Sequence, residues 1–461
     1  MIASGCMVGC GYLQSGSSNQ TAEKSLPVLT DEQLLDTIEH TTFRYFWDAA
    51  EPNSGMARER YHMDNIYPEN DKNIVTTGGT GFGLMAIIVG VERGFITRDE
   101  AINRFDKIIS FLEKADRFHG AWSHWINGET AKTKPFSPKD DGGDIVETSY
   151  LVQGLLTVKQ YLDVQVAGEM ELRARIDSLC NTVEWSWYQN GADVLYWHWS
   201  PKHGWEMNFP IEGYNECLIP YIIGASSPAF PISTAAYHKG WARSGAIKRT
   251  TIKYGITLEL SHNGNPDFGG PLFWSHYSFL GLDPKNLKDS YADYWRHNVN
   301  HVLIDGCYCI ENPKKYKGYG ENCWGLTASY SIPPELENVS GENRQDYKTR
   351  NTEVSYNAHS PTNDHGVISP TAALSSFPYA PEECMKVARF LYDSLGHQLL
   401  GPYGFYDAFS IEYNWFPQKY LAIDQGPIII IIENYRTRLL WDLFMKNQEI
   451  RTGLTKLGFS F

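Results

Sequence analysis

Residues 76–89 read TTGGTGFGLMAIIV, a glycine-rich start that leads into a run of apolar residues. A helix formed by such a run has no polar face, so protein must cover it on every side. Five further stretches repeat this form, with glycine or a polar residue before an apolar run: 143–158, 215–223, 269–280, 365–377 and 424–432. The sequence therefore predicts six short inner helices.

Amphipathic helices alternate with these runs. Thr97 and Glu100 form a capping box, and apolar residues follow them at spacings of three and four up to Leu112. Residues 31–49 and the stretch from Pro381 show the same period. Each repeat unit of about 55–95 residues contains one amphipathic helix and one apolar helix. This repetition predicts an all-α fold, an (α/α)6 barrel or toroid. Its inner helices would begin at one end, where their free N–H groups form the floor of a cleft. An open helical array is the alternative.

We expect residues 26–461 to form one barrel domain, with a long irregular loop from about Gly306 to His365 over the cleft. Residues 1–25 look like the end of a bacterial lipoprotein signal followed by a flexible tether. Cys6 or Cys10 would carry the lipid anchor, which predicts a periplasmic or outer-membrane-anchored protein. No stretch approaches 18 apolar residues, so no membrane span is expected.

The composition is acidic and aromatic. With 40 basic and 54 acidic residues the net charge is −14, which argues against binding to nucleic acid or to anionic membranes. The 14 Trp and 28 Tyr residues favour stacking surfaces of the kind that suit sugar rings, although a Trp-rich core is an equal alternative. The eight cysteines form no C-x-x-C pair and the histidines lack ligand spacing, so we expect no metal and no cofactor.

Carboxylates at the predicted helix starts are the candidates for chemistry. Cleavage of a glycosidic bond needs one carboxylic acid and one carboxylate. Asp144 and Glu147 lie on one helix face in KDDGGDIVET, beside Asp140 and Asp141, and a simple capping box is the alternative. Glu216 precedes the apolar run CLIPYII, which would raise its pKa as a general acid requires, whereas stabilisation of the helix dipole is the alternative. For Asp407 and Asp424 a turn and a helix cap are the alternatives.

Eight blocks then carry a family resemblance over about residues 30–447. The blocks are TTFRYFWDAAEPNSGMARER, TTGGTGFGLMA, KDDGGDIVETSYLVQGLL, GYNECLIPYI, YGENCWGLTAS, ISPTAALSSFPYAPEE, GPYGFYDAFS and DQGPIIIIIENYRTRLLW. They resemble the bacterial glucoamylase-like domain family, which is similar to glycoside hydrolase family 144, the β-1,2-glucan hydrolases. The resemblance implies an (α/α)6 barrel and an inverting hydrolysis of β-1,2-linked glucose chains or oligosaccharides, with sophorose released from a chain end by some members. The older family name implies α-linked glucans, a weaker inference from fold.

The resemblance also implies roles for single residues. Glu216 would be the general acid and Asp407 the base, while Asp144 and Glu147 would lie in the sugar subsites and support catalysis. The residues expected to line the cleft and bind substrate are Arg58, Arg60, Trp122, Asp141, Trp205, Trp324, Tyr406, Trp415 and Asp424.

One block departs from the family pattern. After WGLTAS the family commonly continues with Asp-Gly, whereas Tyr330 and Ser331 follow here, which leaves chain-end and internal cleavage both open. A hydrolase of another glucan, a polysaccharide lyase and a non-catalytic glycan-binding lipoprotein are the alternative functions.

Overall fold

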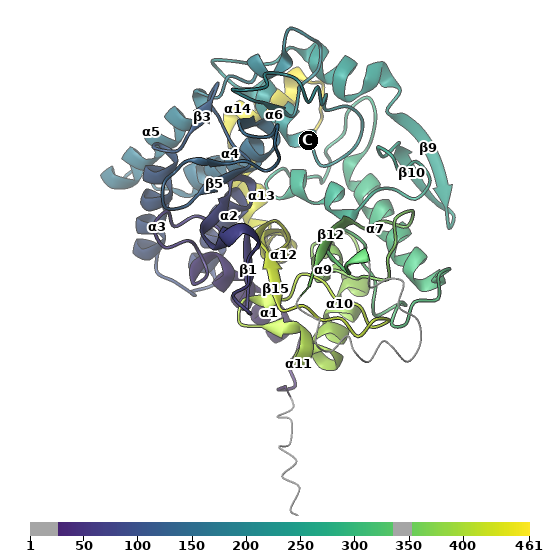
Figure 1. The fold of residues 1–461 in the computed structure, drawn as a ribbon. Coiled ribbons are helices and arrows are strands. Elements are labelled where there is room, and N and C mark those ends of the chain that lie inside the picture. The colour runs from purple at the N-terminus through teal and green to yellow at the C-terminus, as the bar shows by residue number, and fades with distance from the viewer. Residues whose placement is uncertain (1–25, 335–352) are drawn as a thin grey trace, which may run out of the picture.

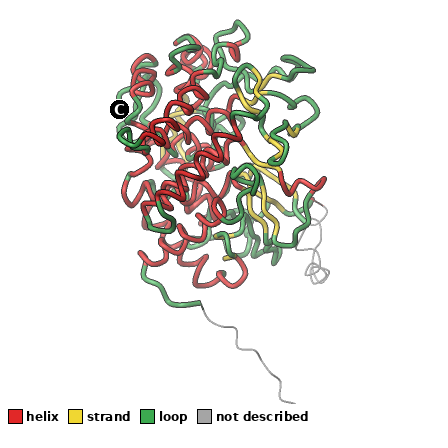
Figure 2. Tube along the Cα trace, turned by 90° about the vertical axis from the view of Figure 1, so that its left-hand side faces the viewer, coloured by secondary structure: helices red, strands yellow, loops and turns green. Residues whose placement is uncertain are grey.

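Helices form the body of the molecule, and short strands and loops gather on one side of it (Figures 1 and 2). The computed structural model describes residues 26–334 and 353–461, so the expected anchor positions Cys6 and Cys10 lie outside the described residues. The helices are α1 (Asp31–Trp47), α2 (Thr77–Glu92), α3 (Arg98–Leu112), α4 (Ile145–Tyr161), α5 (Ala167–Asn181), α6 (Leu218–Ser226), α7 (Tyr294–Glu311), α9 (Pro370–Leu374), α10 (Pro381–Arg389), α11 (Gly396–Leu399), α12 (Ala422–Thr437), α13 (Leu439–Met445) and α14 (Gln448–Lys456).

Four of the six predicted inner helices are α-helices: α2, α4, α6 and α12. Their residues are buried along most or all of their length, because helices pack around them on every side. Helix α2 lies between α4 and α12, and α4 also packs against α6. Gly81 of α2 and Gly154 of α4 face each other, and a Cβ on either would collide with backbone of the other helix. The two backbones are therefore in direct contact.

The other two predicted inner helices are shorter than expected. Residues 273–280 form two 3₁₀ turns, η5 (Leu272–Ser275) and η6 (Tyr277–Phe279), instead of a helix. The stretch 372–377 holds only the end of α9, because Ser376 bonds back to the carbonyl of Ala372 and Pro378 disfavours helical backbone before it. His276 Nε2 and Ser376 Oγ, 3.0 Å apart, join these two segments.

The predicted amphipathic helices form around the inner ones. Capping boxes at Thr30 and Thr97 open α1 and α3, as the sequence predicts for α3. Helix α1 covers α2 and α12, α3 and α5 cover α2 and α4, and α10 covers α9. The C-terminal helices α13 and α14 pack against α4 and α6. The hydrophobic core is thus concentrated between the inner helices and their outer partners.

Strands and loops at the N-terminal ends of the inner helices build one face. The strands are β1 (Arg60–His62), β2 (Ile74–Thr76), β3 (Arg117–Phe118), β4 (Ala121–Trp122), β5 (Trp125–Asn127), β6 (Thr133–Lys134), β7 (Gly143–Asp144), β8 (His198–Trp199), β9 (Lys248–Lys253), β10 (Ile256–Leu260), β11 (Ala328–Ser331), β12 (Ser355–Ala358), β13 (Leu400–Gly401), β14 (Gly404–Phe405) and β15 (Lys419–Leu421). All pairings between them are antiparallel, including β1 with β15 and the three-stranded order β2-β5-β6.

The expected irregular loop from Gly306 to His365 is more ordered than predicted. Helix α7 continues to Glu311, and β11 pairs with β12 in an antiparallel ladder that sets Tyr330 opposite Tyr356. Short-period alternation of Ala, Ser and Tyr is compatible with strands, but it is too weak in the sequence to predict them.

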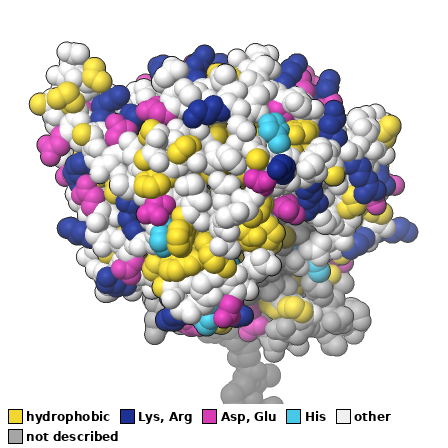
Figure 3. All heavy atoms as spheres, turned by 90° about the horizontal axis from the view of Figure 1, so that it is seen from above, with side chains coloured by type: hydrophobic (Ala, Val, Ile, Leu, Met, Phe, Trp, Pro, Cys, Tyr) yellow, Lys and Arg dark blue, Asp and Glu magenta, His cyan; other side chains and the backbone are white. Residues whose placement is uncertain are grey.

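No helix among residues 26–334 and 353–461 is long and apolar enough to cross a membrane. Viewed from above, charged side chains of both signs are scattered over the surface, and hydrophobic side chains gather in one area at the lower part of the view (Figure 3). In Figure 1 the strand-bearing side of the molecule faces the viewer, and this hydrophobic area lies toward that side.

Candidate active site

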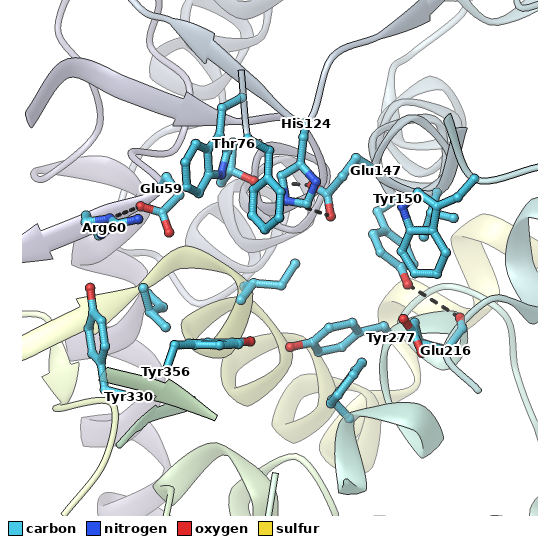
Figure 4. Close-up of a pocket in the computed structure, with 17 residues that line it drawn as sticks. Glu59, Arg60, Thr76, His124, Glu147, Tyr150, Glu216, Tyr277, Tyr330 and Tyr356 are labelled. Carbon is cyan, nitrogen blue, oxygen red and sulfur yellow. Dashed lines mark hydrogen bonds and ion pairs between the residues drawn. The ribbon is translucent and has the colours of Figure 1, made fainter. Parts of the chain in front are cut away.

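A cavity of about 420 Å³ opens where the inner helices begin (Figure 4). Thr76 precedes α2, Glu147 lies in the first turn of α4, Glu216 stands two residues before α6, and Ile423 lies in the first turn of α12. The N-terminal ends of these four inner helices therefore meet at one cavity. The lining residues are Glu59, Arg60, Thr76, His124, Trp125, Phe136, Val146, Glu147, Tyr150, Trp197, Glu216, Phe273, Tyr277, Tyr330, Tyr356, Leu421 and Ile423.

Glu216 is fixed through its backbone while its carboxyl group faces the cavity. Its carbonyl oxygen accepts hydrogen bonds from Ser278 Oγ of η6 and from Tyr150 Oη of α4, the latter at 3.5 Å. Desolvation by the surrounding protein raises the pKa of the Glu216 carboxyl group to about 7, and the charges of Glu147 and Asp144 add to the rise. A carboxyl group with this pKa can hold a proton at neutral pH and release it to a substrate.

Glu147 belongs to a polar network at the start of α2 and α4. Its Oε2 accepts a hydrogen bond from the Gly78 backbone N–H at 2.8 Å and lies 3.3 Å from Thr76 Oγ1. Burial raises its pKa, while the positive charge of His124 opposes the rise. Its side chain does not close a capping box, because it points to α2 and the cavity instead of back to residue 144.

Asp144 is fully buried and acts as the N-cap of α4. Its Oδ1 accepts from the backbone N–H groups of Val146 and Glu147, each at 2.9 Å. Its Oδ2 holds His124 Nδ1 at 3.0 Å and accepts from Trp197 Nε1 at 3.1 Å. Asp144 does not line the cavity, but it positions two side chains that do.

His124 carries a positive charge at neutral pH. Burial alone would lower its pKa, but the carboxylates of Glu147, Asp144 and Asp140 outweigh burial and raise the pKa to about 9. His124, Asp140 and Asp144 are the group with metal-ligating spacing among the described residues, with ligand atoms within 4.8 Å of one another. In the structure, Asp144 already uses both oxygens for its cap, His124 and Trp197.

At the side of the cavity away from Glu216, Glu59 and Arg60 form an ion pair at the start of β1 (Figure 4). The Arg60 guanidinium lies over the ring of Trp125, 5.4 Å from its centre. Burial raises the pKa of Glu59, and the charge of Arg60 opposes the rise. This wall presents one carboxylate and one cation side by side.

Asp407 and Asp424 form a buried carboxyl pair behind the cavity wall. Asp407 Oδ2 accepts from the backbone N–H of Tyr330 at 2.7 Å, and Asp424 Oδ1 lies 3.4 Å from the hydroxyl of Tyr277. Burial raises the pKa of Asp407 to about 7 and that of Asp424 well above its usual range, and the charge of Asp407 adds to the rise at Asp424. Two buried carboxyls that interact in this way do not both carry a charge at neutral pH, so the pair holds a proton. Tyr277 connects the pair to the cavity, where its hydroxyl points toward that of Tyr356 (Figure 4).

Several residues that the resemblance placed in the cleft lie elsewhere. Arg58 bonds the carbonyl of Ala49 and the side chain of Asn73, which makes it a buried support of the chain. The others outside the cavity are Trp122, Trp324, Tyr406 and Trp415, which are buried in the hydrophobic clusters, Trp205, which packs on neighbouring aromatic rings, and Asp141, which pairs with Lys202 and Ser200. None of these side chains lines this cavity, because a motif does not say which way a side chain points.

Sequence reasoning missed much of the lining. Glu59 stands between Arg58 and Arg60, which the sequence did indicate, and His124 and Trp125 follow Trp122 in the sequence, with Trp125 at the start of β5. A histidine next to aromatic residues ahead of the acidic KDDGGD block was the available signal for His124. Tyr277 lies in the 269–280 stretch that the sequence marked only as an inner helix, and Tyr356 lies in the stretch taken as a loop.

Known proteins share sequence and fold with this chain. The family model described as "Glycoamylase: Putative glucoamylase" matches residues 208–448. An exo β-1,2-glucooligosaccharide sophorohydrolase (non-reducing end) of Parabacteroides distasonis is 44% identical over 463 residues, which cover 96% of this chain and 60% of that protein. The chain thus spans 60% of the length of this curated relative.

Two solved structures share the fold closely. An endo-β-1,2-glucanase from Chitinophaga pinensis, in complex with sophorotriose and glucose, has a TM-score of 0.88 and 57% identity, over 94% of this chain and 99% of that one. A β-1,2-glucanase from Parabacteroides distasonis has a TM-score of 0.84 and 43% identity, over 94% of this chain and 60% of that one. The helical fold is the fold of these glucanases.

Proposed function

The chain belongs to the glucoamylase-like family, and on that premise we propose that it is a glycoside hydrolase of β-1,2-linked glucans or their oligosaccharides. The observation that carries the proposal is Glu216, whose carboxyl group has a pKa raised to about 7 and faces a cavity walled by aromatic rings. We also propose that the helices close into an (α/α)6 barrel. Helix α2 contacts α4, α4 contacts α6, α9 contacts α12 and α12 contacts α2, and together with the His276–Ser376 hydrogen bond these contacts support a closed ring.

Glu216 is the general acid in this proposal. It donates its proton to the glycosidic oxygen as the bond from that oxygen to the anomeric carbon breaks. Because Glu216 is desolvated and close to two other carboxylates, it stays protonated at a pH where an ordinary glutamate would have lost its proton.

The Asp407–Asp424 pair is the proton acceptor for the attacking water. Neither carboxyl lines the cavity, so the proton must pass through Tyr277, whose hydroxyl lies 3.4 Å from Asp424 Oδ1. Water bonds to the anomeric carbon from the side opposite the leaving oxygen. Its proton goes to the Tyr277 oxygen while the Tyr277 proton moves to the pair, so the configuration inverts in a single displacement.

Substrate assays test the proposal directly. The purified protein is incubated separately with linear β-1,2-glucan and with soluble starch, and products are separated by chromatography. We expect Glu216→Gln to abolish turnover of β-1,2-glucan, whereas Glu171→Gln, exposed on α5, keeps it. Turnover of starch alone would overturn the proposed linkage, and glucan binding without any product would favour the non-catalytic alternative. A product that absorbs ultraviolet light would identify a lyase.

A further inference from the structure

A group of aromatic rings lies on the surface outside the cavity of the candidate active site. The rings come from three segments that are far apart in the sequence, and they belong to His119, Trp187, Trp199 and Trp205. We call these four residues the aromatic platform, and none of them lines the cavity. His119 follows β3, which lies in the upper part of Figure 1, and Figure 3 views that end of the molecule, where hydrophobic side chains gather in one area.

Trp187, which opens the 3₁₀ turn η2 (Trp187–Gln189), stands at the centre of the platform. The His119 ring stacks on it, with ring centres 3.7 Å apart and 15° between the planes. The Trp205 ring lies 6.3 Å away at 37°, and the Trp199 ring lies 6.4 Å away at 79°. Trp187 is nevertheless 40% exposed, and the other two tryptophans are partly exposed. A cluster of large rings that stays open to solvent indicates a binding surface.

The indole N–H groups of the platform are free to bond a ligand. In the part of the chain that the structure describes, Nε1 of Trp187, Trp199 and Trp205 donates no hydrogen bond, and those of Trp199 and Trp205 are open to solvent. Trp122 and Trp197, in contrast, donate to protein oxygens at 3.2 and 3.1 Å. An aromatic face with a free donor at its edge matches a sugar ring, which has C–H groups on its face and hydroxyl groups around its rim.

The hairpin that carries His119 holds the histidine ring against the platform. Two residues, His119 and Gly120, join β3 to β4, and both have positive φ, 49° and 79°. A two-residue turn of this kind favours asparagine before the glycine, whereas histidine adds a ring that stacks on Trp187. Glu184 fixes this ring, because its Oε2 accepts from His119 Nδ1 at 3.0 Å and its N–H donates to the His119 carbonyl at 3.0 Å. The platform is therefore ordered before any ligand binds.

The charged groups beside the platform are already paired. Glu184 is bonded to His119, and Glu206, which follows the last ring of the platform, lies 3.1 Å from Lys139. Paired charges favour a neutral ligand over an anion or a cation. Four partly exposed rings also present far less than the about 800 Å² that each partner buries in a standard protein interface, so a chain of sugar rings fits this surface better than a second protein.

A short stretch of chain connects the platform to the cavity. Trp197 lines the cavity, and Trp199, two residues later, belongs to the platform. Trp199 pairs with Gly143 in the ladder of β7 and β8, next to Asp144, which accepts a hydrogen bond from Trp197. A glucan chain on the platform is therefore held close to the cavity.

We propose that the aromatic platform is a second glycan-binding surface, which holds β-1,2-glucan outside the cavity and takes no part in the chemistry. The identity of the ligand rests on the proposed function, which makes β-1,2-glucan the glycan that this protein meets. A polymer held on the platform has a high effective concentration at the cavity. The platform should thus lower KM for long chains and have no effect on oligosaccharides too short to reach it.

Retardation in native gels that contain linear β-1,2-glucan measures binding to the polymer. Glu216→Gln serves as the parent protein, so that the polymer is not consumed during the run. Trp187→Ala removes the central ring, and His119→Asn removes the stack while it keeps a residue that the turn favours. Tyr435→Ala is the matched control, since Tyr435 is 43% exposed and packs on Phe377 with 5.5 Å between ring centres.

We expect Trp187→Ala to raise the apparent Kd for the polymer about fivefold and His119→Asn to raise it about twofold, because an aromatic contact contributes a factor of this size. Tyr435→Ala should leave the apparent Kd unchanged, and thermal melts check that each variant is folded. With Glu216 intact, Trp187→Ala should raise KM for the polymer. It should not change kcat/KM for the shortest oligosaccharide that the wild-type protein cleaves.

The outcomes separate this inference from the proposed function. If both platform variants are retarded as strongly as their parent, the platform binds no glucan and the inference is overturned. An equal loss of kcat/KM on the polymer and on the shortest oligosaccharide also overturns it, because the rings would then belong to the active site. If the wild-type protein cleaves no β-1,2-glucan but retardation still depends on Trp187, the proposed function fails and the platform stands. Should Trp187→Ala not fold, His119→Asn decides.

Discussion

Replacement of Asp144 separates two contributions of one buried carboxylate. Asp144→Ala removes the N-cap of α4 and the partner of His124, whereas Asp144→Asn keeps a side chain that caps equally well but carries no charge. The two variants therefore measure the stabilisation from the helix cap and the stabilisation from the charge pair separately.

The magnitudes follow from the contacts. Loss of the cap costs about 1 kcal/mol, and loss of a hydrogen bond to the charged His124 costs about 1.5–3 kcal/mol. Asp140, whose pKa is raised to about 7 by burial and by the charge of Asp144, is mostly protonated at pH 6, so relief of its repulsion with Asp144 offsets little of this loss at that pH. We expect Asp144→Ala to lower the free energy of unfolding by about 3 kcal/mol at pH 6, and Asp144→Asn by about 1–2 kcal/mol.

The stability that the ion pairs of His124 contribute depends on pH. The pKa of His124 is raised to about 9 in the folded protein, above the value of about 6.5 expected for the unfolded chain. Its ion pairs therefore stabilise the fold fully below pH 6.5, and this stability is lost as pH rises through about 9. The difference between the wild-type protein and Asp144→Asn should narrow at pH 9.5.

Denaturant unfolding followed by tryptophan fluorescence at pH 6 and pH 9.5 measures these differences. If the free energy of unfolding of Asp144→Ala is within about 1 kcal/mol of the wild-type value at pH 6, the cap and the His124 pair do not stabilise the fold as argued. If the difference in free energy of unfolding between the wild-type protein and Asp144→Asn is the same at both pH values, His124 takes part in no pH-dependent charge pair.

Further predictions concern the cavity and its surroundings. For β-1,2-glucan, kcat/KM of the wild-type protein should fall as pH rises above about 7, since Glu216 must be protonated to act, and pH-rate profiles check this. Gly78→Ala should lower kcat/KM about tenfold, because a Cβ there would lie 2.6 Å from Glu147 Oε2, while Gly168→Ala, with open space around it, should change nothing in the same assay. Trp122→Phe should lower the free energy of unfolding by about 1 kcal/mol, because the hydrogen bond from Trp122 to the Leu112 carbonyl is lost, but it should leave kcat/KM unchanged. Denaturant unfolding and the β-1,2-glucan assay on the same variant check both expectations.

The elements that could be predicted from the sequence are those with local causes. The capping box at Thr97 and the period of α3 act within a few residues, and both are confirmed. Glu147 and Glu216 meet at one cavity, as expected from a single assumption, that the inner helices begin at the same end.

Side-chain direction could not be predicted, because it is set by pairing between distant segments. Trp122 in β4 and Trp125 in β5 lie three residues apart in strands of different sheets, yet Trp122 is buried in the core and Trp125 lines the cavity. Tyr330 and Tyr356 meet only through the register of β11 and β12, across a gap of more than twenty residues. Asp407 reaches the cavity through Asp424 and Tyr277, a relay that no local pattern encodes.

The glycine contact between α2 and α4 limits how this site can evolve. Gly81 and Gly154 bring two backbones together, and neither position has room for even one additional carbon atom. Substitutions that reshape the binding site therefore cannot accumulate at this seam, and the position of Glu147 relative to Thr76 is fixed with it. New substrate preferences must arise in the rim, where β11, β12 and the loops beside them can change length and sequence without disturbing the helices beneath. Members of the family can thus differ in the loops around the cavity while the packing of the inner helices stays the same.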